Sequence, residues 1–191
     1  NHPLRPHWIK NKMGEEIQKW ILNADAITCT TSRLADKLRQ YNPYADVHVI
    51  PNGLPFDEDQ FTTYRTESDI SRFIYTASES HVWDTQLLRM PFSKLNTLSN
   101  SKFILAGYHS NNPKVWDKMQ SVFKLTKNYV LKSFMPLDSY MNVYNDSDVS
   151  IVPLENNIFT PYKSNLKILE AGCKNIPVIC SHAPPYSDEP N

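Results

Sequence analysis

Short apolar runs alternate with helix-length segments along almost the whole chain, and this alternation is the feature that most constrains its fold. The runs are rich in β-branched and aromatic residues, which favour strands. The predicted strands cover residues 26–30, 47–50, 73–77, 102–107, 129–131, 149–153 and 178–180. Between them, apolar spacing and capping residues predict helices over residues 13–22, 32–41, 87–98, 115–125 and 137–144, and one that starts at residue 164 or 165.

Strands separated by helices in this way predict right-handed crossovers and a parallel sheet covered on both faces. We therefore expect an α/β fold with a doubly wound, Rossmann-like parallel sheet. The turn Pro51-Asn52-Gly53, followed by an acidic stretch, is the best boundary in the chain. Only two strand–helix elements precede it, too few for a domain, and the chain ends soon after its last predicted strand. We expect a piece cut at both ends, with residues 1–52 and 53–191 as its two parts.

The composition excludes several classes of function. Twenty basic residues balance twenty acidic ones, whereas a broad nucleic-acid-binding surface normally needs a basic excess. No apolar run approaches the roughly 20 residues that span a bilayer. Three irregularly spaced cysteines do not form a disulfide framework, which favours a cytoplasmic protein. Cys29 and Cys180 lie in apolar runs, and we expect both to be buried.

The stretch PYKSNLKILEAGCKNIPVICS, residues 161–181, carries the clearest chemistry. Lys163, Lys167 and Glu170 are spaced i, i+4, i+7, which would place all three on one face of a helix. Ser164 and Asn165 are good N-cap residues, so the helix should start there. Free N–H groups at its start, helped by the lysines, would bind a diphosphate, and Glu170 could accept hydrogen bonds from ribose hydroxyls. The alternative is a solvated helix in which Glu170 pairs with Lys167 or Lys174.

Three ordered motifs in the second half of the chain resemble a known family. They are NDSDVSIVPL at 145–154, KSNLKILEAG at 163–172 and IPVICS at 176–181. Together they resemble the signature of GT-B glycosyltransferases of the GT4-like group. The earlier ADAITCTTS at 24–32 and VHVIPNG at 47–53 resemble the link between the two domains of that family. The resemblance covers nearly the whole chain in order.

This resemblance implies a nucleotide-sugar-binding domain over residues 53–191, preceded by the last elements of the N-terminal, acceptor-binding domain. It implies that Glu170 binds the ribose of a UDP- or GDP-linked sugar. Lys163, Ser164, Asn165, Leu166 and Lys167 would hold the diphosphate, and Phe134 and Met135 would adjoin the base. Transfer would retain the anomeric configuration and need neither metal nor cofactor. The acceptor could be a glycan, a lipid or a small molecule, and peripheral attachment to a membrane is compatible with this.

Three departures from the family pattern open other functions. Tyr162 stands where the family has a second glutamate, and Ala77-Ser78-Glu79-Ser80-His81 replaces a glycine and a basic pair. Most of the acceptor-binding domain is missing, so we expect no turnover from this chain alone. The first two departures favour a non-catalytic nucleotide- or sugar-binding module. A sugar-nucleotide epimerase of the same fold is a further alternative.

Other residues give weaker signals. His81 follows a predicted strand and Tyr186 follows the last one, so either could approach the donor sugar. Asp57-Glu58-Asp59 and Asp146-Ser147-Asp148 both read D-x-D, a metal-diphosphate motif in other transferases, but in the resemblance Asp148 is a structural residue. No metal site is predicted. Trp20 lies on the apolar stripe of the first predicted helix, and we expect it in a core.

Overall fold

The structure is a computed structural model that describes residues 5–187. The chain divides into two compact units. The first unit comprises the described parts of residues 1–53, 157–165 and 183–191, and the second comprises residues 54–156 and 166–182. The assignment of an acceptor-binding and a donor-binding domain on either side of residue 52 is not tested by this division and stays a prediction.

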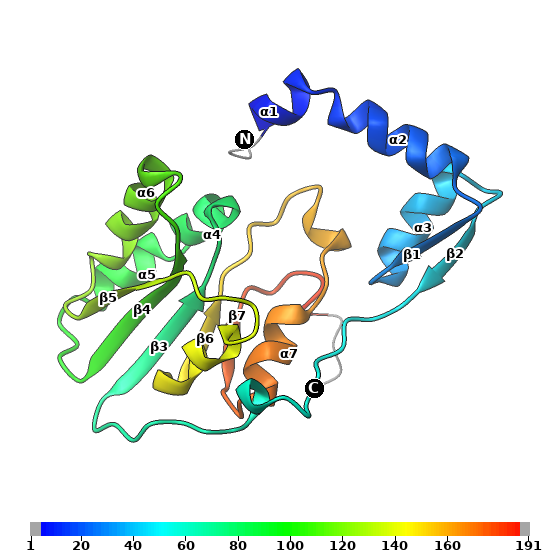
Figure 1. Cartoon of the computed structure of the whole chain (residues 1–191). Coiled ribbons are helices and arrows are strands. Elements are labelled where there is room, and N and C mark those ends of the chain that lie inside the picture. The colour runs from blue at the N-terminus through cyan, green and yellow to red at the C-terminus, as the bar shows by residue number, and fades with distance from the viewer. Residues whose placement is uncertain (1–4, 188–191) are drawn as a thin grey trace. The chain divides into compact units, whose positions relative to one another are not determined.

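The first unit contains a small parallel sheet and three helices (Figure 1). The helices are α1 (Arg5–Lys10), α2 (Met13–Asn23) and α3 (Ser32–Tyr41), and the paired strands are β1 (Ala26–Cys29) and β2 (Asp46–Val49). The 3₁₀-helix η4 (Thr160–Tyr162) also belongs to it. Its buried core consists of Cys29, Ala35 and Val47.

The second unit is built on a five-stranded sheet in which every pairing is parallel. The strands are β3 (Ser71–Thr76), β4 (Ser101–Tyr108), β5 (Tyr129–Ser133), β6 (Val149–Val152) and β7 (Val178–Cys180). Their order is β5-β4-β3-β6-β7, with β3 at the centre in Figure 1. The chain therefore builds outward from β3 in one direction and then returns to build outward from its other side. This confirms the predicted doubly wound, parallel α/β fold.

Helices cover both faces of this sheet because its strands bury alternate residues on opposite sides. On one face, Tyr75 and Leu105 pack against α4 (Val82–Gln86), α5 (Arg89–Lys94) and α6 (Pro113–Phe123). On the other face, Ile74 and Ile104 pack against η3 (Tyr140–Asp146), α7 (Leu166–Cys173) and residues of η1 (Asp59–Phe61). A last 3₁₀-helix, η2 (Glu79–His81), leads into α4. The apolar layers on the two faces of the sheet hold its strands in place and so position their ends.

Two predicted helices differ in the structure. The helix expected over 87–98 is shortened to α5. It ends at Lys94 because Leu95 is followed by Asn96, Thr97, Ser99 and Asn100, which are poor helix formers. The α-helix expected over 137–144 is instead the 3₁₀-helix η3. Its sequence YMNVYND is rich in residues of low helix propensity, which favours the tighter, shorter form.

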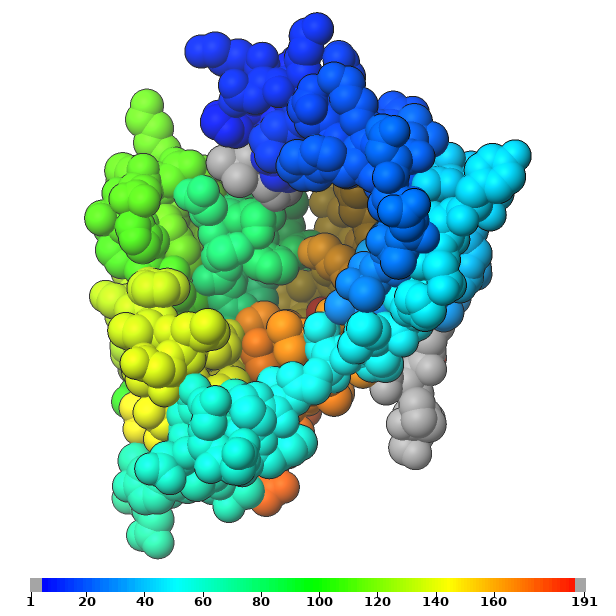
Figure 2. All heavy atoms as spheres, turned by 45° about the vertical axis from the view of Figure 1, so that its right-hand side comes forward, coloured from blue at the N-terminus to red at the C-terminus, as the bar shows by residue number. Residues whose placement is uncertain are grey.

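Three local expectations in or near the first unit and the last strand were also wrong. Thr31, not Ser32, caps α3, because its Oγ1 accepts a hydrogen bond from the Leu34 N–H at 3.2 Å. Cys180 is exposed because β7 is an edge strand, whereas Cys29 is buried as expected. Trp20 is 70% exposed rather than in a core. Within residues 5–187 the apolar stripe of α2, drawn in blue in Figure 2, has no buried member.

None of the helices in residues 5–187 has the length and apolar character needed to cross a bilayer.

Candidate functional site

A pocket of about 240 Å³ lies at the carboxyl ends of β3, β4 and β5. Ligands of open α/β sheets bind outside the carboxyl ends of the strands, next to the point where the strand order reverses. Here that point lies between β3 and β6. The residues that line the pocket all belong to the second unit: Ala77, Ser78, His81, Ala106, Gly107, Ser133, Phe134, Met135, Tyr140, Val143 and Lys167.

Gly107 allows the backbones of β3 and β4 to approach each other at the floor of this pocket. Its φ is +105°, and a Cβ at this position would lie 2.1 Å from the Ala77 carbonyl oxygen. The β4–β5 register shifts between Ala106 and Tyr108, at the same place. Only glycine fits here without displacing the turn after β3. The sequence pattern gave no sign of this requirement.

A polar cluster forms one wall of the pocket, and we call it the Lys167 cluster: Thr76, Tyr140, Tyr144, Lys167 and Glu170. Lys167 Nζ donates to Thr76 Oγ1 at 2.9 Å, Tyr140 Oη at 2.7 Å and Glu170 Oε2 at 2.9 Å. Glu170 Oε2 also accepts from the hydroxyls of Tyr140 at 3.1 Å and Tyr144 at 2.9 Å. Three donors therefore converge on one carboxylate oxygen.

The environment keeps the Lys167 cluster charged. Burial of Lys167 lowers the pKa of its ammonium, but the neighbouring Tyr140 oxygen and Glu170 carboxylate outweigh that effect and raise the pKa. Burial, together with the charge of Glu170, raises the pKa of Tyr144 well above its ordinary value. Its hydroxyl consequently stays protonated and remains a hydrogen-bond donor to Glu170. Near neutral pH the pocket therefore presents a lysine cation at its wall.

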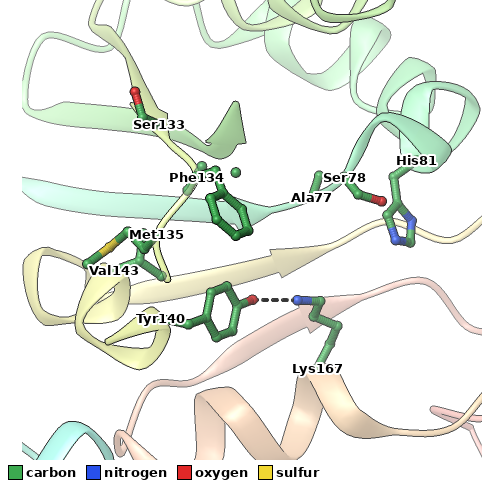
Figure 3. Close-up of a pocket in the computed structure, with 11 residues that line it drawn as sticks. Ala77, Ser78, His81, Ser133, Phe134, Met135, Tyr140, Val143 and Lys167 are labelled. Carbon is green, nitrogen blue, oxygen red and sulfur yellow. Dashed lines mark hydrogen bonds between the residues drawn. The ribbon is translucent and has the colours of Figure 1, made fainter. Parts of the chain in front are cut away.

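Aromatic and apolar side chains complete the pocket. Figure 3 shows Met135 and Val143 at one end and Ser78 and His81 at the other, with Phe134, Tyr140 and Lys167 between them. Phe134 is 60% exposed, and its ring packs edge-on against His109 with the ring centres 6.0 Å apart. This gives the pocket an apolar end suited to a flat ring and a polar end suited to charged or hydroxylated groups.

A second, more open cleft adjoins the other side of Tyr140. It has a volume of about 710 Å³, and its lining includes Leu54, Phe61, Leu137, Leu166 and Glu170 as well as Tyr140. Leu166 is the first residue of α7, and Glu170 lies one turn further along, 6% exposed. Tyr140 thus separates the pocket that Lys167 lines from the cleft that Glu170 lines.

The predicted site residues fall into two groups. His81, Phe134, Met135 and Lys167 meet in the pocket, and Leu166 and Glu170 line the adjoining cleft. The others, Tyr162, Lys163, Ser164, Asn165 and Tyr186, belong to the first unit. Ser164 Oγ accepts from the Asn52 side chain at 2.7 Å, within that unit. The roles of this second group stay predictions.

Helix α7 starts at Leu166, immediately after Asn165, as the N-cap residues predicted. The expectation that Lys163 shares a helix face with Lys167 and Glu170 was wrong. Lys163 precedes α7 with an extended backbone, φ −72° and ψ 160°, and is exposed. The residues that cap a helix have non-helical backbone, so the i, i+4 spacing does not apply across the cap.

The Asp146-Ser147-Asp148 motif is structural. Asp148 accepts from the Arg72 guanidinium at Nε and Nη2, both at 3.0 Å, and from the Arg72 backbone N–H at 2.8 Å. Asp146 accepts from Lys132 Nζ at 2.8 Å. Asp57 and Asp59 of the other D-x-D motif are exposed. Among residues 5–187, no group of three histidine, cysteine or acidic side chains is placed to hold a metal ion.

Sequence reasoning missed several residues of the site. Tyr140 and Tyr144 both lie in η3, and nothing local indicated that their hydroxyls would meet Glu170. Thr76, at the end of β3, and Asp84, which contacts His81, were also missed. The useful signal was the end of a predicted strand, which would have placed Thr76 beside the pocket.

The chain thus has a doubly wound parallel sheet with a candidate pocket at the carboxyl ends of β3, β4 and β5. Solved structures share this fold. The chain is similar to HepE from Anabaena, in complex with UDP and glucose, with a TM-score of 0.65, 12% sequence identity, and coverage of 96% of this chain and 51% of that chain.

Two further structures support the same fold. One is TarM from S. aureus in complex with fondaparinux, α-GlcNAc-glycerol and UDP, with a TM-score of 0.60, 14% identity, and coverage of 94% of this chain and 35% of that one. The other is a trehalose-6-phosphate synthase, studied for glycosyl transfer with retention, with a TM-score of 0.57, 10% identity, and coverage of 87% and 48%. No family model and no curated protein matches the sequence.

The predicted likeness in fold to GT-B glycosyltransferases is therefore confirmed. The chain spans about a third to a half of the length of these structures. Membership of the GT4-like group stays a prediction.

Proposed function

We propose that this chain is the donor-binding part of a metal-independent, retaining GT-B glycosyltransferase that uses a nucleotide-linked sugar. The observation that carries the proposal is the Lys167 cluster. From the first turns of α7, Lys167 lines the pocket at the carboxyl ends of the strands, and the buried Glu170 lines the cleft beside it. The fold shared with UDP-bound HepE and TarM supports the choice of ligand.

Lys167 and the start of α7 would bind the diphosphate. In glycosyl transfer, the bond between the anomeric carbon and the diphosphate oxygen breaks, and negative charge grows on the leaving diphosphate. A fixed ammonium and the free N–H groups of a helix start stabilise such charge without a metal ion. Lys163, Ser164, Asn165 and Leu166 would add contacts to the same phosphates, as the sequence predicts.

Glu170 would bind the ribose. A carboxylate has acceptor sites on both oxygens, and the three hydrogen bonds from Lys167, Tyr140 and Tyr144 all go to Oε2. The Oε1 atom is left to accept from ribose hydroxyls. The donors on Oε2 hold the carboxylate in one orientation, which lowers the entropic cost of binding.

Phe134 and Met135 would adjoin the base at the apolar end of the pocket, where an exposed ring can stack on it. His81, Tyr162 and Tyr186 are the proposed contacts of the donor sugar. The acceptor, whether glycan, lipid or small molecule, would come to residues of the other domain. We propose that the enzyme needs no cofactor and acts in the cytoplasm. Peripheral contact with a membrane is compatible with a lipid acceptor.

A non-catalytic nucleotide- or sugar-binding module is the second candidate, favoured by Tyr162 and by the absence of a basic pair after β3. It would bind the same ligand without transfer. An epimerase of the same fold would interconvert free sugar nucleotides. Assays of transfer and of interconversion with the full-length gene product separate these three functions.

The first experiment measures binding of UDP, GDP and ADP to this chain by calorimetry, with Lys167→Met and Glu170→Gln beside the parent. One nucleotide should bind, and each substitution should weaken its binding by about 1.5–3 kcal/mol, the range for hydrogen bonds to charged groups. Met and Gln stay close to the volume of the native side chains, but Lys167→Met leaves the buried Glu170 carboxylate without its cation. Unfolding curves of each variant therefore establish that affinity is measured on folded protein.

Lys94→Ala is the matched control, because Lys94 is an exposed lysine on α5 and does not line the pocket. It should leave the affinity for the nucleotide unchanged. A folded parent that binds none of the three nucleotides would contradict the proposal. Equal losses of affinity in Lys94→Ala and Lys167→Met would show a non-specific effect of charge instead.

A further inference from the structure

The ring of His81 is held by a buried carboxylate. Asp84 Oδ2 lies 2.7 Å from His81 Nδ1, and the Asp84 side chain is only 8% exposed. The other oxygen, Asp84 Oδ1, accepts from the Glu155 backbone N–H at 2.7 Å. Asp84 therefore connects the turn after β3 to the segment after β6, and it contacts His81 from α4, one helical turn away.

Two more contacts fix the position of His81. The Thr85 hydroxyl donates to the His81 carbonyl oxygen at 2.9 Å, which holds the backbone of the turn. The ring of Tyr75 packs edge-on against the imidazole, with the ring centres 6.5 Å apart. A histidine restrained at its backbone, its ring and one ring nitrogen has little rotational freedom. Such restraint is more than a merely solvated loop histidine would have.

The contact with Asp84 also determines which ring nitrogen carries a proton. An ionised carboxylate only accepts hydrogen bonds, so Nδ1 must donate to it. Nδ1 then carries a proton in both the neutral and the cationic imidazole, and Nε2 is the atom left for a ligand. The neutral form accepts a hydrogen bond at Nε2, and the cationic form donates one there.

The position of His81 in the pocket indicates which part of a ligand it meets. In Figure 3, Met135 and Val143 lie at the opposite end from His81, and Lys167 lies between them. With the base at the apolar end and the diphosphate at Lys167, the next group along the pocket is the transferred sugar. A sugar hydroxyl can donate and accept, so it pairs with Nε2 in either charge state.

We propose that Asp84 is a positioning residue that fixes the His81 imidazole so that its Nε2 binds a hydroxyl of the donor sugar. This inference rests on the proposed function for its ligand. It assigns to Asp84 a role that acts through His81. Asp84 does not itself touch the donor.

Two measurements on this chain test the proposal. The first is a long-range ¹H–¹⁵N NMR spectrum at about pH 8, where histidines are ordinarily neutral, with His81→Gln used to assign the signals. The parent should show His81 protonated at Nδ1. Asp84→Asn should shift it toward a mixture of tautomers, because the amide offers both a donor and an acceptor.

The second measurement compares the affinities for UDP-glucose and UDP. Asp84→Asn and His81→Gln should each lower the affinity for UDP-glucose by about three- to tenfold, the range for one neutral hydrogen bond. The affinity of each variant for UDP should stay within twofold of that of the parent. UDP-GlcNAc is measured beside UDP-glucose because the sugar is unidentified. Asp36→Asn and His48→Gln, exposed positions on α3 and β2, serve as matched controls.

The outcomes separate the inference from the proposed function. If His81 is protonated at Nε2 in the parent, the positioning role is overturned, even when UDP binds. If Asp84→Asn lowers the affinities for UDP and for UDP-sugars equally, Asp84 acts only through the backbone contact with Glu155. That result overturns the proposed contact between His81 and the sugar. If the folded parent binds no nucleotide, the proposed function fails and the ligand assigned to His81 fails with it.

Discussion

Two ionic clusters stand at opposite ends of the same sheet. At the amino ends of β3 and β6, Arg72 makes a two-pronged contact with Asp148 and further hydrogen bonds to Thr66. At the carboxyl ends, Lys167 contacts Glu170, Tyr140 and Thr76. Each cluster pairs a cation with a carboxylate, yet the Arg72 side chain is 6% exposed and the Lys167 side chain is 26% exposed.

The difference shows how the fold separates structure from function. The Arg72 guanidinium donates hydrogen bonds to Asp148 and Thr66, and its contacts with Asp148 join β3 to β6. The Arg72 side chain lines none of the described pockets. Lys167 and Glu170 have the same charges, but each lines a cavity in which a ligand can replace water. Charge type alone does not identify a site. Asp148 and Thr66 of the amino-end cluster also line a cleft, so the difference is that the cation itself lines a pocket only at the carboxyl end.

Breaking the amino-end cluster should give the largest effect on stability. Asp148→Ala leaves the buried Arg72 guanidinium without its carboxylate, and loss of one partner of a buried pair costs about 3 kcal/mol. Urea unfolding at neutral pH measures it. Asp138→Ala is the matched control, because Asp138 is an exposed aspartate of the same unit and should change stability by less than about 0.5 kcal/mol. Similar stability of both variants would mean that the amino-end cluster is not structural.

Adding a side chain at the floor of the pocket should have the next largest effect on stability. Gly107→Ala places a Cβ against the Ala77 carbonyl oxygen at a φ of +105°, which should cost about 2 kcal/mol of stability. The turn that carries Ser78 and His81 would have to move, so nucleotide affinity should fall as well. Gly53→Ala is the control, because an added Cβ there meets no atom within 4 Å. Unfolding curves and calorimetry together report both effects, and normal affinity in Gly107→Ala would contradict the placement of the ligand.

The strands could be predicted from sequence because local pattern determines them. The strand predicted over residues 178–180 coincides with β7, and the motif from Lys163 to Gly172 correctly located the start of α7. Lys167 and Glu170 were found because helical spacing relates them within one element. Lys163 was misplaced because it lies just outside that element.

The rest of the site depends on contacts between distant segments, which no local pattern encodes. Glu170 meets Tyr144 across 26 positions of sequence, and Lys167 meets Thr76 across 91. The His81–Asp84 contact is local, but its importance depends on the pocket that brings it near Lys167. For Trp20 the local pattern was misleading. Its apolar stripe predicts burial, but nothing in the described part of the chain covers it.

Loosening the carboxyl-end cluster should have a smaller effect than breaking the amino-end one. Tyr140→Phe removes a donor to Glu170 and an acceptor for Lys167 but leaves Tyr144 and the ion pair in place. The free energy of unfolding should fall by about 1 kcal/mol, the net value of a typical hydrogen bond. Tyr41→Phe, at an exposed tyrosine on α3, is the control. A loss as large as that of Asp148→Ala would show that the two clusters are equally structural.

Acid should weaken the amino-end cluster by a modest amount. Hydrogen bonds from Arg72 lower the pKa of Asp148, and the contact with Lys132 lowers the pKa of Asp146, in each case against the effect of burial. A carboxyl whose folded pKa lies below its unfolded value stabilises the protein fully above the unfolded value, near 3.8. That stabilisation is lost as the pH falls through the folded pKa. Urea unfolding between pH 6 and pH 3 should show a decline confined to the acid end, and Asp148→Asn should reduce its slope. An unchanged slope in Asp148→Asn would assign the acid sensitivity to other carboxyls, because the asparagine cannot titrate.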